Sequence, residues 1–455
     1  MIQLTHIQKI YFIGIGGIGM SALARYFLSK GTQVSGYDKT ITALTETLEK
    51  EGINIHYTED VNCIPKDVDI VVYTPAIPAA HAELTYYREN GYTVVKRSDV
   101  LQWITEHSFN ICVAGTHGKT TVTSMIAHIL RDAAYGCNAF LGGIAANYNT
   151  NFWSHERNVV VVEADEYDRS FLKLFPNIAV ITSMDPDHLD IYGTAEEVEN
   201  AFVQFAEKIK PGGCLITKLG LKRAGSLEAA NLYTYDFNNE NADVHVTNLS
   251  VSDGSYSFSI VGKGWVLDEM VLNMGGLHNI DNMLAAVTVA KHIVIDDNKI
   301  RKAVAGFKGV RRRFEYALKT NEHVLIDDYA HHPEELNALI SGVKSLYPGK
   351  PITLVFQPHL FSRTKDQAEP FAKSLSKVDE VLLLPIYPAR ELPIEGVTSE
   401  MLLEKISLPA SAKKVIEKEA LLNWVAEKKP GLMVMAGAGD IDILVQSVKK
   451  ILESN

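Results

Sequence analysis

The chain has 455 residues, of which 46% are hydrophobic and 22% are charged, a balance typical of globular rather than disordered or fibrous proteins. At about 150 residues per domain, this length predicts roughly three domains. The 44 basic and 55 acidic residues give a net charge of −11, which argues against a nucleic-acid partner because phosphate backbones are bound by basic surfaces.

The cysteines indicate a reducing compartment, and the hydropathy gives no sign of a membrane segment. The four cysteines are scattered and form no Cys-x-x-Cys pair of the kind that holds zinc: Cys63, Cys112, Cys137 and Cys214. No apolar run reaches the roughly 18 residues of a membrane helix. The first residues also lack the basic start and cleavable apolar segment of a signal peptide. We therefore expect a cytoplasmic protein without a membrane partner.

Strand-like and helical runs alternate over residues 1–106. The first of them read KIYFIGIG, MSALARYFLSKG, QVSGYD, TALTETLEKEG and DIVVYTP. Such β-α alternation with short connections predicts a parallel sheet flanked by helices. A new strand, NICVAG, follows a short helical stretch, so we place the first domain boundary near His107.

The section from 107 to 313 continues this pattern and then changes. NVVVVEADE, NIAVITSMD and GCLIT read as further strands, whereas residues from about 231 to 272 alternate polar and apolar side chains, which suggests antiparallel strands. The helical HNIDNMLAAVTVAKHI follows, and FKGVRRRFEY looks like a linker. Residues 314–455 return to β-α order through HVLIDDYA, ITLVFQPH, EVLLLPIYP and GLMVMAGAG.

A glycine loop follows the first strand. Gly14, Gly16 and Gly19 satisfy Gly-x-Gly-x-x-Gly between a strand and a helix, where backbone N–H groups can approach a diphosphate. Asp38 ends the next strand, where a dinucleotide-binding fold places a ribose-binding acid. A redox cofactor, another diphosphate ligand and a purely structural turn all fit this motif.

The second loop, GTHGKTT, is more specific. It is two residues shorter than the common Gly-x4-Gly-Lys-Ser/Thr spacing, but it also joins a strand to a helix. Its amides would cradle phosphates, Lys119 would neutralise a γ-phosphoryl group and Thr120 would reach magnesium. The alternative is an incidental turn. Glu163 and His188 follow neighbouring strands and could complete a magnesium site, although alone each reads as a solvated acid or a loop histidine.

Polar groups also cluster in the last third of the chain. Three arginines at the presumed hinge, Arg311 to Arg313, could clamp phosphates or form a solvated face. DDYAHHPEE and FQPHLFSRT follow strands at the edge where open α/β sheets bind ligands.

Ten motifs occur in the order found in Mur ligases, a family that this chain resembles from about Ile10 to Ile441: IGIGGIGMS, GTHGKTT, EADEYD, DPDHLD, GLHNIDN, GVRRRFE, DDYAHHP, FQPHLFSRT, YPARE and GAGDI. The resemblance implies an α/β protein of three domains. These are a Rossmann-like domain for a UDP-sugar (1–106), a central P-loop-type ATPase sheet with a small antiparallel part (107–313), and a Rossmann-like domain for the amino acid (314–455). It further implies a magnesium-dependent ligase that uses ATP to join L-alanine to UDP-N-acetylmuramate in peptidoglycan precursor synthesis, acting as a monomer or homodimer.

The same resemblance assigns site residues. The UDP-sugar would be bound by Gly14, Gly16, Gly17, Ile18, Gly19 and Asp38. ATP would be bound by Gly115, Thr116, His117, Gly118, Lys119, Thr120, Thr121, Asn279, Asn282, Arg313 and Asp328. Magnesium would be held by Thr120, Glu163 and His188. The reaction centre would contain Lys119, His188, His359 and Arg363, with Arg363 as a carboxylate partner and either histidine as the base for the alanine amine.

Departures from the family pattern leave alternatives. Val203 and Gln204 stand where sibling ligases carry a carbamylated lysine, so no carbamate is expected. Tyr167 and Ala330 favour the related ligase that recycles the wall tripeptide, whereas FQPHLFSRT and YPARELPIEGVTS favour the alanine-adding members. Outside the family there are two alternatives. A nicotinamide-dependent oxidoreductase built on the first loop would leave the GTHGKTT loop unexplained, and a nucleotide-gated binding protein without chemistry would release no phosphate with the full substrate set.

Overall fold

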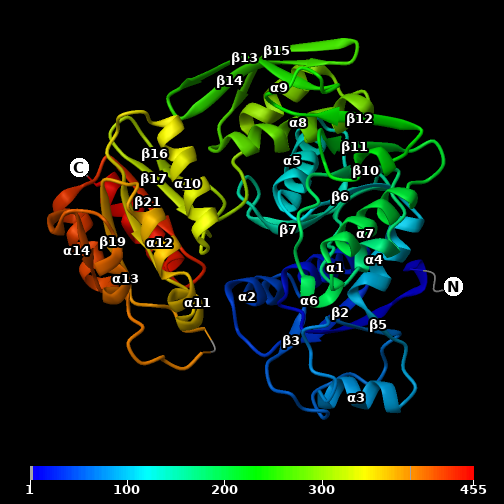
Figure 1. Cartoon of the computed structure of the whole chain (residues 1–455). Helices are drawn as coiled ribbons and strands as arrows, with labels where there is room; N and C mark the ends of the chain where they lie inside the picture. Colours follow the sequence, from blue (N-terminus) through cyan, green and yellow to red (C-terminus); the bar gives the residue numbers. More distant parts are fainter. Residues whose placement is uncertain (1–3, 390, 455) are drawn as a thin grey trace. The chain divides into compact units, whose positions relative to one another are not determined.

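The computed structural model describes residues 4–389 and 391–454 (Figure 1). The chain divides into two compact units. The first comprises Met1–Thr247, Ser259–Asp268 and Asp281–Val304, and the second comprises Asn248–Phe258, Glu269–Ile280 and Ala305–Asn455.

The N-terminal sheet has the strand order β3-β2-β1-β4-β5, and all of its strands are parallel. The strands are β1 (Lys9–Ile13), β2 (Gln33–Tyr37), β3 (Asn54–His56), β4 (Ile70–Tyr73) and β5 (Val94–Lys96), and the helices are α1 (Ile18–Ser29), α2 (Ala43–Lys50), α3 (Ala82–Glu89) and α4 (Arg97–Glu106). The sheet order reverses beside β1, so the loop after β1 opens into the crevice where such sheets bind ligands.

The central sheet has the order β12-β11-β10-β6-β9-β7-β8. Its strands are β6 (Phe109–Ala114), β7 (Asn138–Ala145), β8 (Thr150–Trp153), β9 (Val159–Glu163), β10 (Ile178–Ile181), β11 (Cys214–Lys218) and β12 (Asn231–Tyr235). Only β7 and β8 pair antiparallel in this sheet. Its helices are α5 (Lys119–Asp132), α6 (Leu189–Tyr192), α7 (Ala195–Glu207), α8 (Leu277–His292) and α9 (Asp297–Gly306).

The expectation of antiparallel strands from 231 to 272 is wrong at its start. Residues 231–235 form β12, which extends the central sheet parallel to β11 because the connection between them is a crossover rather than a hairpin. The polar alternation of β12 reflects its place at the edge of the sheet. A separate three-stranded sheet contains β13 (His245–Ser252), β14 (Ser255–Gly262) and β15 (Trp265–Leu272). Two-residue connections join these strands, as antiparallel hairpins require.

The C-terminal sheet has the order β16-β17-β21-β18-β19-β20, with β16 antiparallel and the other strands parallel. Its strands are β16 (Glu315–Lys319), β17 (Val324–Asp328), β18 (Thr353–Phe356), β19 (Glu380–Leu383), β20 (Lys413–Val415) and β21 (Leu432–Ala436). The helices are α10 (Pro333–Leu346), α11 (Phe361–Asp366), α12 (Ala368–Leu375), α13 (Ser399–Lys405), α14 (Lys418–Lys428) and α15 (Asp442–Glu453). The short strands β16 and β20 were not expected from the sequence.

Within the first unit, helix α1 packs directly against the central sheet. Tyr26 of α1 lies 5.4 Å from Phe140 of β7, ring centre to ring centre, and Phe140 in turn contacts Phe152 of β8. The buried amide of Asn151 donates to the Ile18 carbonyl (2.6 Å) and to the Ser21 hydroxyl (2.9 Å). These contacts at the start of α1 fix the first glycine loop beside the central sheet.

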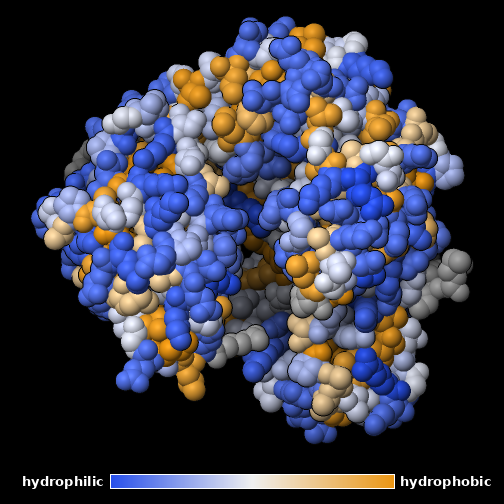
Figure 2. Space-filling model, in the orientation of Figure 1, coloured by the Kyte–Doolittle hydropathy of each residue, from blue (hydrophilic) through white to orange (hydrophobic). Residues whose placement is uncertain are grey.

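The face drawn in Figure 2 is mostly hydrophilic, and its apolar residues stand in small separate groups. Among the residues that the structure describes, no helix is long and apolar enough to cross a membrane.

Candidate active site

The loop between β6 and α5 has the geometry of a phosphate-binding turn. Gly115 and Gly118 have φ angles of 135° and 84°, a region that favours glycine. A Cβ atom at Gly115 would lie 2.1 Å from Oγ1 of Thr182, and one at Gly118 would lie 2.7 Å from Oδ1 of Asn282. Neither position tolerates a side chain. The second contact places Asn282 beside the loop, and its role in ATP binding stays a prediction.

Residues after β10 hold this loop from the side, and the sequence reasoning missed them. The hydroxyl of Ser183 lies 2.9 Å from that of Thr116 and accepts from the backbone N–H of His117 (2.8 Å). The Asp185 N–H donates to the Thr116 hydroxyl (3.1 Å). The Thr-Ser pair that follows β10 could have indicated these contacts. Because β10 lies next to β6 and the two strands are parallel, both end at the same sheet edge.

Lys119 starts α5 and is already paired. Its ammonium donates to the Gly115 carbonyl (2.7 Å) and lies 2.8 Å and 2.7 Å from the two carboxylate oxygens of Glu166. Glu166 is only 1% exposed. This carboxylate was not predicted as a site residue, although it stands in the quoted motif EADEYD.

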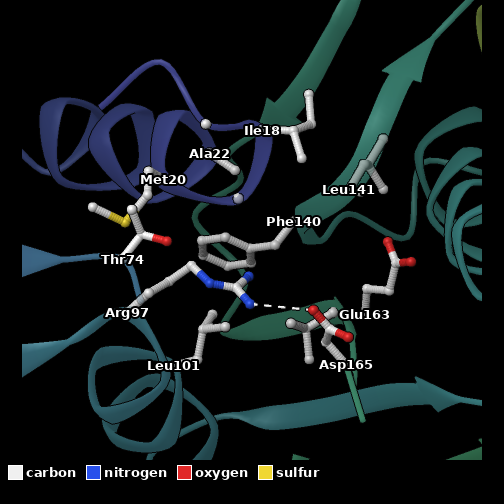
Figure 3. Close-up of a pocket in the computed structure, with 14 residues that line it drawn as sticks. Ile18, Met20, Ala22, Thr74, Arg97, Leu101, Phe140, Leu141, Glu163 and Asp165 are labelled. Carbon is white, nitrogen blue, oxygen red and sulfur yellow. Dashed lines mark ion pairs between the residues drawn. The ribbon is translucent and has the colours of Figure 1, made fainter. Parts of the chain in front are cut away.

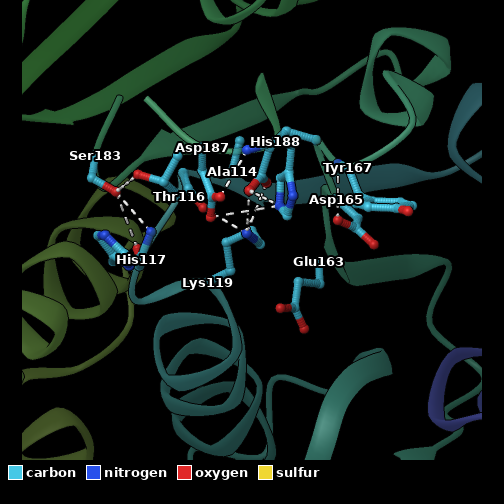
Figure 4. Close-up of polar contacts among 12 residues, drawn as sticks. Ala114, Thr116, His117, Lys119, Glu163, Asp165, Tyr167, Ser183, Asp187 and His188 are labelled. Atoms are coloured by element: carbon cyan, nitrogen blue, oxygen red, sulfur yellow. Dashed lines mark hydrogen bonds and ion pairs between the residues drawn. The ribbon is translucent and has the colours of Figure 1, made fainter. Parts of the chain in front are cut away.

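The residues expected to hold magnesium supply suitable donors. The Thr120 hydroxyl donates to Oε1 of Glu163 (2.7 Å). Nε2 of His188, which Figure 4 shows, lies 3.9 Å from Oε1 of Glu166. Within the described part of the chain, no three His, Cys, Asp or Glu side chains form a ready-made metal site. A hydroxyl and a carboxylate nevertheless fit Mg²⁺, because this ion commonly takes one or two protein ligands and completes its shell with nucleotide phosphates and water.

The glycine loop after β1 is closed by an acid. Gly14 has a φ of 86°, and its N–H donates to the Tyr37 carbonyl (2.8 Å). The Asp38 carboxylate accepts from the N–H groups of Gly16 (2.8 Å) and Thr40 (3.1 Å). Asp38 therefore stabilises the loop itself, and its predicted role toward the ribose stays a prediction.

A pocket of about 320 Å³ joins the first loop to the central sheet (Figure 3). Gly17, Ile18 and Gly19 line it from the loop, and Phe140, Leu141, Gly142, Glu163 and Asp165 line it from β7 and the end of β9. The guanidinium of Arg97 projects into it and pairs with Asp165 at 3.6 Å. Arg97 follows β5 directly and was not predicted as a site residue. Its place at the end of a strand in a nucleotide-binding sheet is the sequence feature that could have indicated an anion-binding role.

The second unit contains the remaining predicted ATP contacts. Asp328 ends β17, and its two oxygens accept from the N–H groups of Phe314 and Ala330, both at 2.7 Å. Burial raises the pKa of Asp328 to about 6, while these hydrogen bonds and the Arg313 charge act to lower the pKa. Arg312 has a structural role, because its guanidinium donates to the carbonyl of Gly437. Asn279 donates to the Gly275 carbonyl (2.6 Å).

The structure brings His359 and Arg363 together after β18. Nη1 of Arg363 lies 3.4 Å from Nδ1 of His359, and the His359 ring stacks on Tyr387 with the ring centres 5.7 Å apart. His331 approaches the same ring at 5.9 Å. Burial, followed by the charges of Arg363 and His331, lowers the pKa of His359. Both effects favour the neutral imidazole, which lies beside a cation that could pair with a carboxylate.

Comparison with known proteins decides the family. Three family descriptions match in succession: "Mur ligase family, catalytic domain" at residues 9–109, "Mur ligase middle domain" at 113–290 and "Mur ligase, glutamate ligase domain" at 312–439. The UDP-N-acetylmuramate–L-alanine ligase of Parabacteroides distasonis is 49% identical, over 99% of this chain and 98% of its own length. The chain belongs to the Mur ligase family. The UDP-N-acetylmuramate–L-alanine ligase of Cytophaga hutchinsonii is 48% identical, over 99% of this chain and 98% of its own length.

Solved structures place this Mur ligase in the expected fold class. The UDP-N-acetylmuramate-alanine ligase of Thermotoga maritima superposes with a TM-score of 0.80 at 28% identity, covering 98% of this chain and 99% of its own. The murein peptide ligase of Psychrobacter arcticus, with a TM-score of 0.65 and 21% identity over 98% of this chain and 99% of its own, shares the fold. The predicted three-domain α/β architecture is confirmed, whereas the proposed boundaries at 106 and 313 stay predictions.

Proposed function

We propose that this Mur ligase joins L-alanine to the carboxylate of UDP-N-acetylmuramate, with conversion of ATP to ADP and phosphate, in peptidoglycan precursor synthesis. The observation that carries the proposal is the pocket between Gly17–Gly19 and Glu163. Glu163 is hydrogen-bonded to Thr120 of the phosphate loop, so one cavity adjoins both loops. A sugar nucleotide held by the first loop would thus present its carboxylate to a nucleotide held by the second.

The first step is formation of an acyl phosphate. A carboxylate oxygen of the sugar attacks the γ-phosphorus of ATP, the bond to the β-phosphate oxygen breaks, and ADP leaves. Lys119 and the amides of residues 115–118 stabilise the charge on the transferring group. Thr120 and Glu163, with His188 nearby, would hold a magnesium ion, which neutralises phosphate charge when bound. Arg97 lies where it can bind an anionic group of the sugar nucleotide in the pocket.

The second step is attack by the alanine amine on the acyl carbon, with loss of phosphate. Arg363 would bind the carboxylate of alanine, and the neutral ring of His359 would accept the proton that the attacking nitrogen loses. His188 is the alternative base. We further propose a cytoplasmic monomer or homodimer.

Relatives bearing the alanine ligase name match this chain at 45–49% identity over at least 98% of its length, whereas the murein peptide ligase structure is 21% identical. This difference favours L-alanine over the wall tripeptide as the second substrate. The test is phosphate release from ATP with magnesium and UDP-N-acetylmuramate, with L-alanine in one reaction and the tripeptide in another. We expect release with L-alanine and a product heavier by one alanine residue. Release only with the tripeptide would assign the recycling reaction instead.

A further inference from the structure

The phosphate-loop lysine is held by a buried carboxylate that the reaction above does not use. Glu166 contacts the Lys119 ammonium through both oxygens, at 2.8 Å and 2.7 Å. The carboxylate is 1% exposed, and the lysine side chain is 15% exposed. A charge pair so far removed from water is a strong local constraint, since either charge left alone would be costly.

Glu166 lies between the two sides of the site. It stands three positions after Glu163, the last residue of β9. Glu163 contacts the Thr120 hydroxyl, and Glu166 contacts the ammonium of Lys119, the residue before Thr120. Nε2 of His188 lies 3.9 Å from Oε1 of the same Glu166. In Figure 4 the Lys119 amine and the His188 ring point toward the same place, while Glu163 lies apart from them.

The backbone of Glu166 is also fixed. Its carbonyl accepts from the Tyr192 hydroxyl (2.6 Å) and from the Arg169 N–H (3.0 Å). These bonds anchor the backbone at Glu166 while a phosphate draws the Lys119 ammonium toward the loop. A nucleotide must compete with Glu166 for this cation.

We propose that Glu166 is a positioning residue that holds Lys119 and orients His188, and that the nucleotide phosphate displaces it from the ammonium. This inference rests on the proposed function, in which Lys119 acts on the γ-phosphoryl group. Two consequences follow. The carboxylate weakens ATP binding, because it competes for Lys119 and places a negative charge near the triphosphate. It also increases turnover, because it holds Lys119 beside the loop until the phosphate arrives and keeps His188 oriented afterwards.

The test compares Glu166→Gln with Asp168→Asn. Asp168 lies in the same loop and accepts from the Ser170 N–H (3.1 Å), so its replacement removes an equal charge at a neighbouring position. Calorimetric titration with ATP in magnesium buffer, without the other substrates, gives the dissociation constant. We expect this constant to fall at least about threefold in Glu166→Gln, while kcat falls at least about tenfold. Asp168→Asn should change neither quantity by more than about twofold.

Three results would overturn the proposal: an unchanged or raised dissociation constant for ATP, an unchanged kcat, or an equal effect of Asp168→Asn. If Glu166→Gln does not fold, Glu166→Asp replaces it. The shorter carboxylate keeps the charge but withdraws from Lys119 and His188, so kcat should fall while the dissociation constant for ATP should not rise. Native kcat in that variant would contradict the proposal. A native protein that binds ATP but releases no phosphate would overturn the proposed function instead, and the two affinities would still decide the role of Glu166.

Discussion

The Thr120 hydroxyl donates a hydrogen bond of 2.7 Å to Glu163, which joins the phosphate loop to the end of β9. This contact places a hydroxyl and a carboxylate where a magnesium ion bound to ATP would need oxygen ligands. We predict that Glu163→Gln lowers kcat by about a hundredfold or more and raises the magnesium concentration needed for half-maximal rate. Steady-state rates over a magnesium series test this. The exposed Glu228→Gln should behave as the native protein does, and a native magnesium response in Glu163→Gln would refute the assignment.

Gly142 of β7 sets the place of the same carboxylate. A Cβ atom at this position would lie 1.8 Å from Oε2 of Glu163, so even alanine must push that side chain away. We predict that Gly142→Ala lowers turnover at least about tenfold while circular dichroism stays native. Gly225 has open space around it, and Gly225→Ala is the matched control. Native turnover in Gly142→Ala would mean that Glu163 can move without loss of the reaction.

Loss of the Lys119 charge should affect both chemistry and stability. We predict that Lys119→Ala abolishes phosphate release, because the transferring group loses its cation. It should also lower the free energy of unfolding by about 3 kcal/mol, since Glu166 would stay buried without its partner. Phosphate assays and urea unfolding measure the two effects. A folded Lys119→Ala protein with near-normal turnover would contradict the proposed reaction.

The sequence predicted the parts of this site that depend on local chain geometry. Both glycine loops follow strands and precede helices. Glu163 ends β9 and His188 follows β10, the two strands on either side of β6, so the direction of the chain suffices to place them at one sheet edge. It did not predict Glu166, Arg97 or Ser183. Their roles depend on which side chains of adjacent loops turn toward one another, and an acid three residues after Glu163 has no periodic signal. The error over β12 has a similar cause, since an edge strand alternates like a hairpin strand.

The lowered pKa of His359 should appear in the pH dependence of kcat/KM. Burial and the Arg363 charge lower the pKa of His359, so the acidic limb of kcat/KM for L-alanine should lie below the usual histidine value of 6.5. Arg363→Gln removes a charge that lowers the pKa, so the limb should move to higher pH, in addition to an overall loss of rate. Lys365→Gln removes an exposed charge on the same helix and should leave the limb in place. An unmoved limb in Arg363→Gln would point to His188 as the base.

Asp327 should make stability depend on pH. Burial raises the pKa of this β17 carboxyl to about 7, against the opposing effect of Arg312, and its Oδ1 has no hydrogen-bond partner among the described residues. The folded protein therefore binds a proton that the unfolded chain releases near pH 4, so stability should fall as the pH rises from about 4 to about 7. Asp327→Asn should remove this loss, which could reach about 4 kcal/mol. Urea unfolding at pH 5 and pH 8 measures it. We expect the free energy of unfolding of the variant to exceed that of the native protein at pH 8 by more than at pH 5. An equal pH dependence in both proteins would show that ionisation of Asp327 does not lower stability.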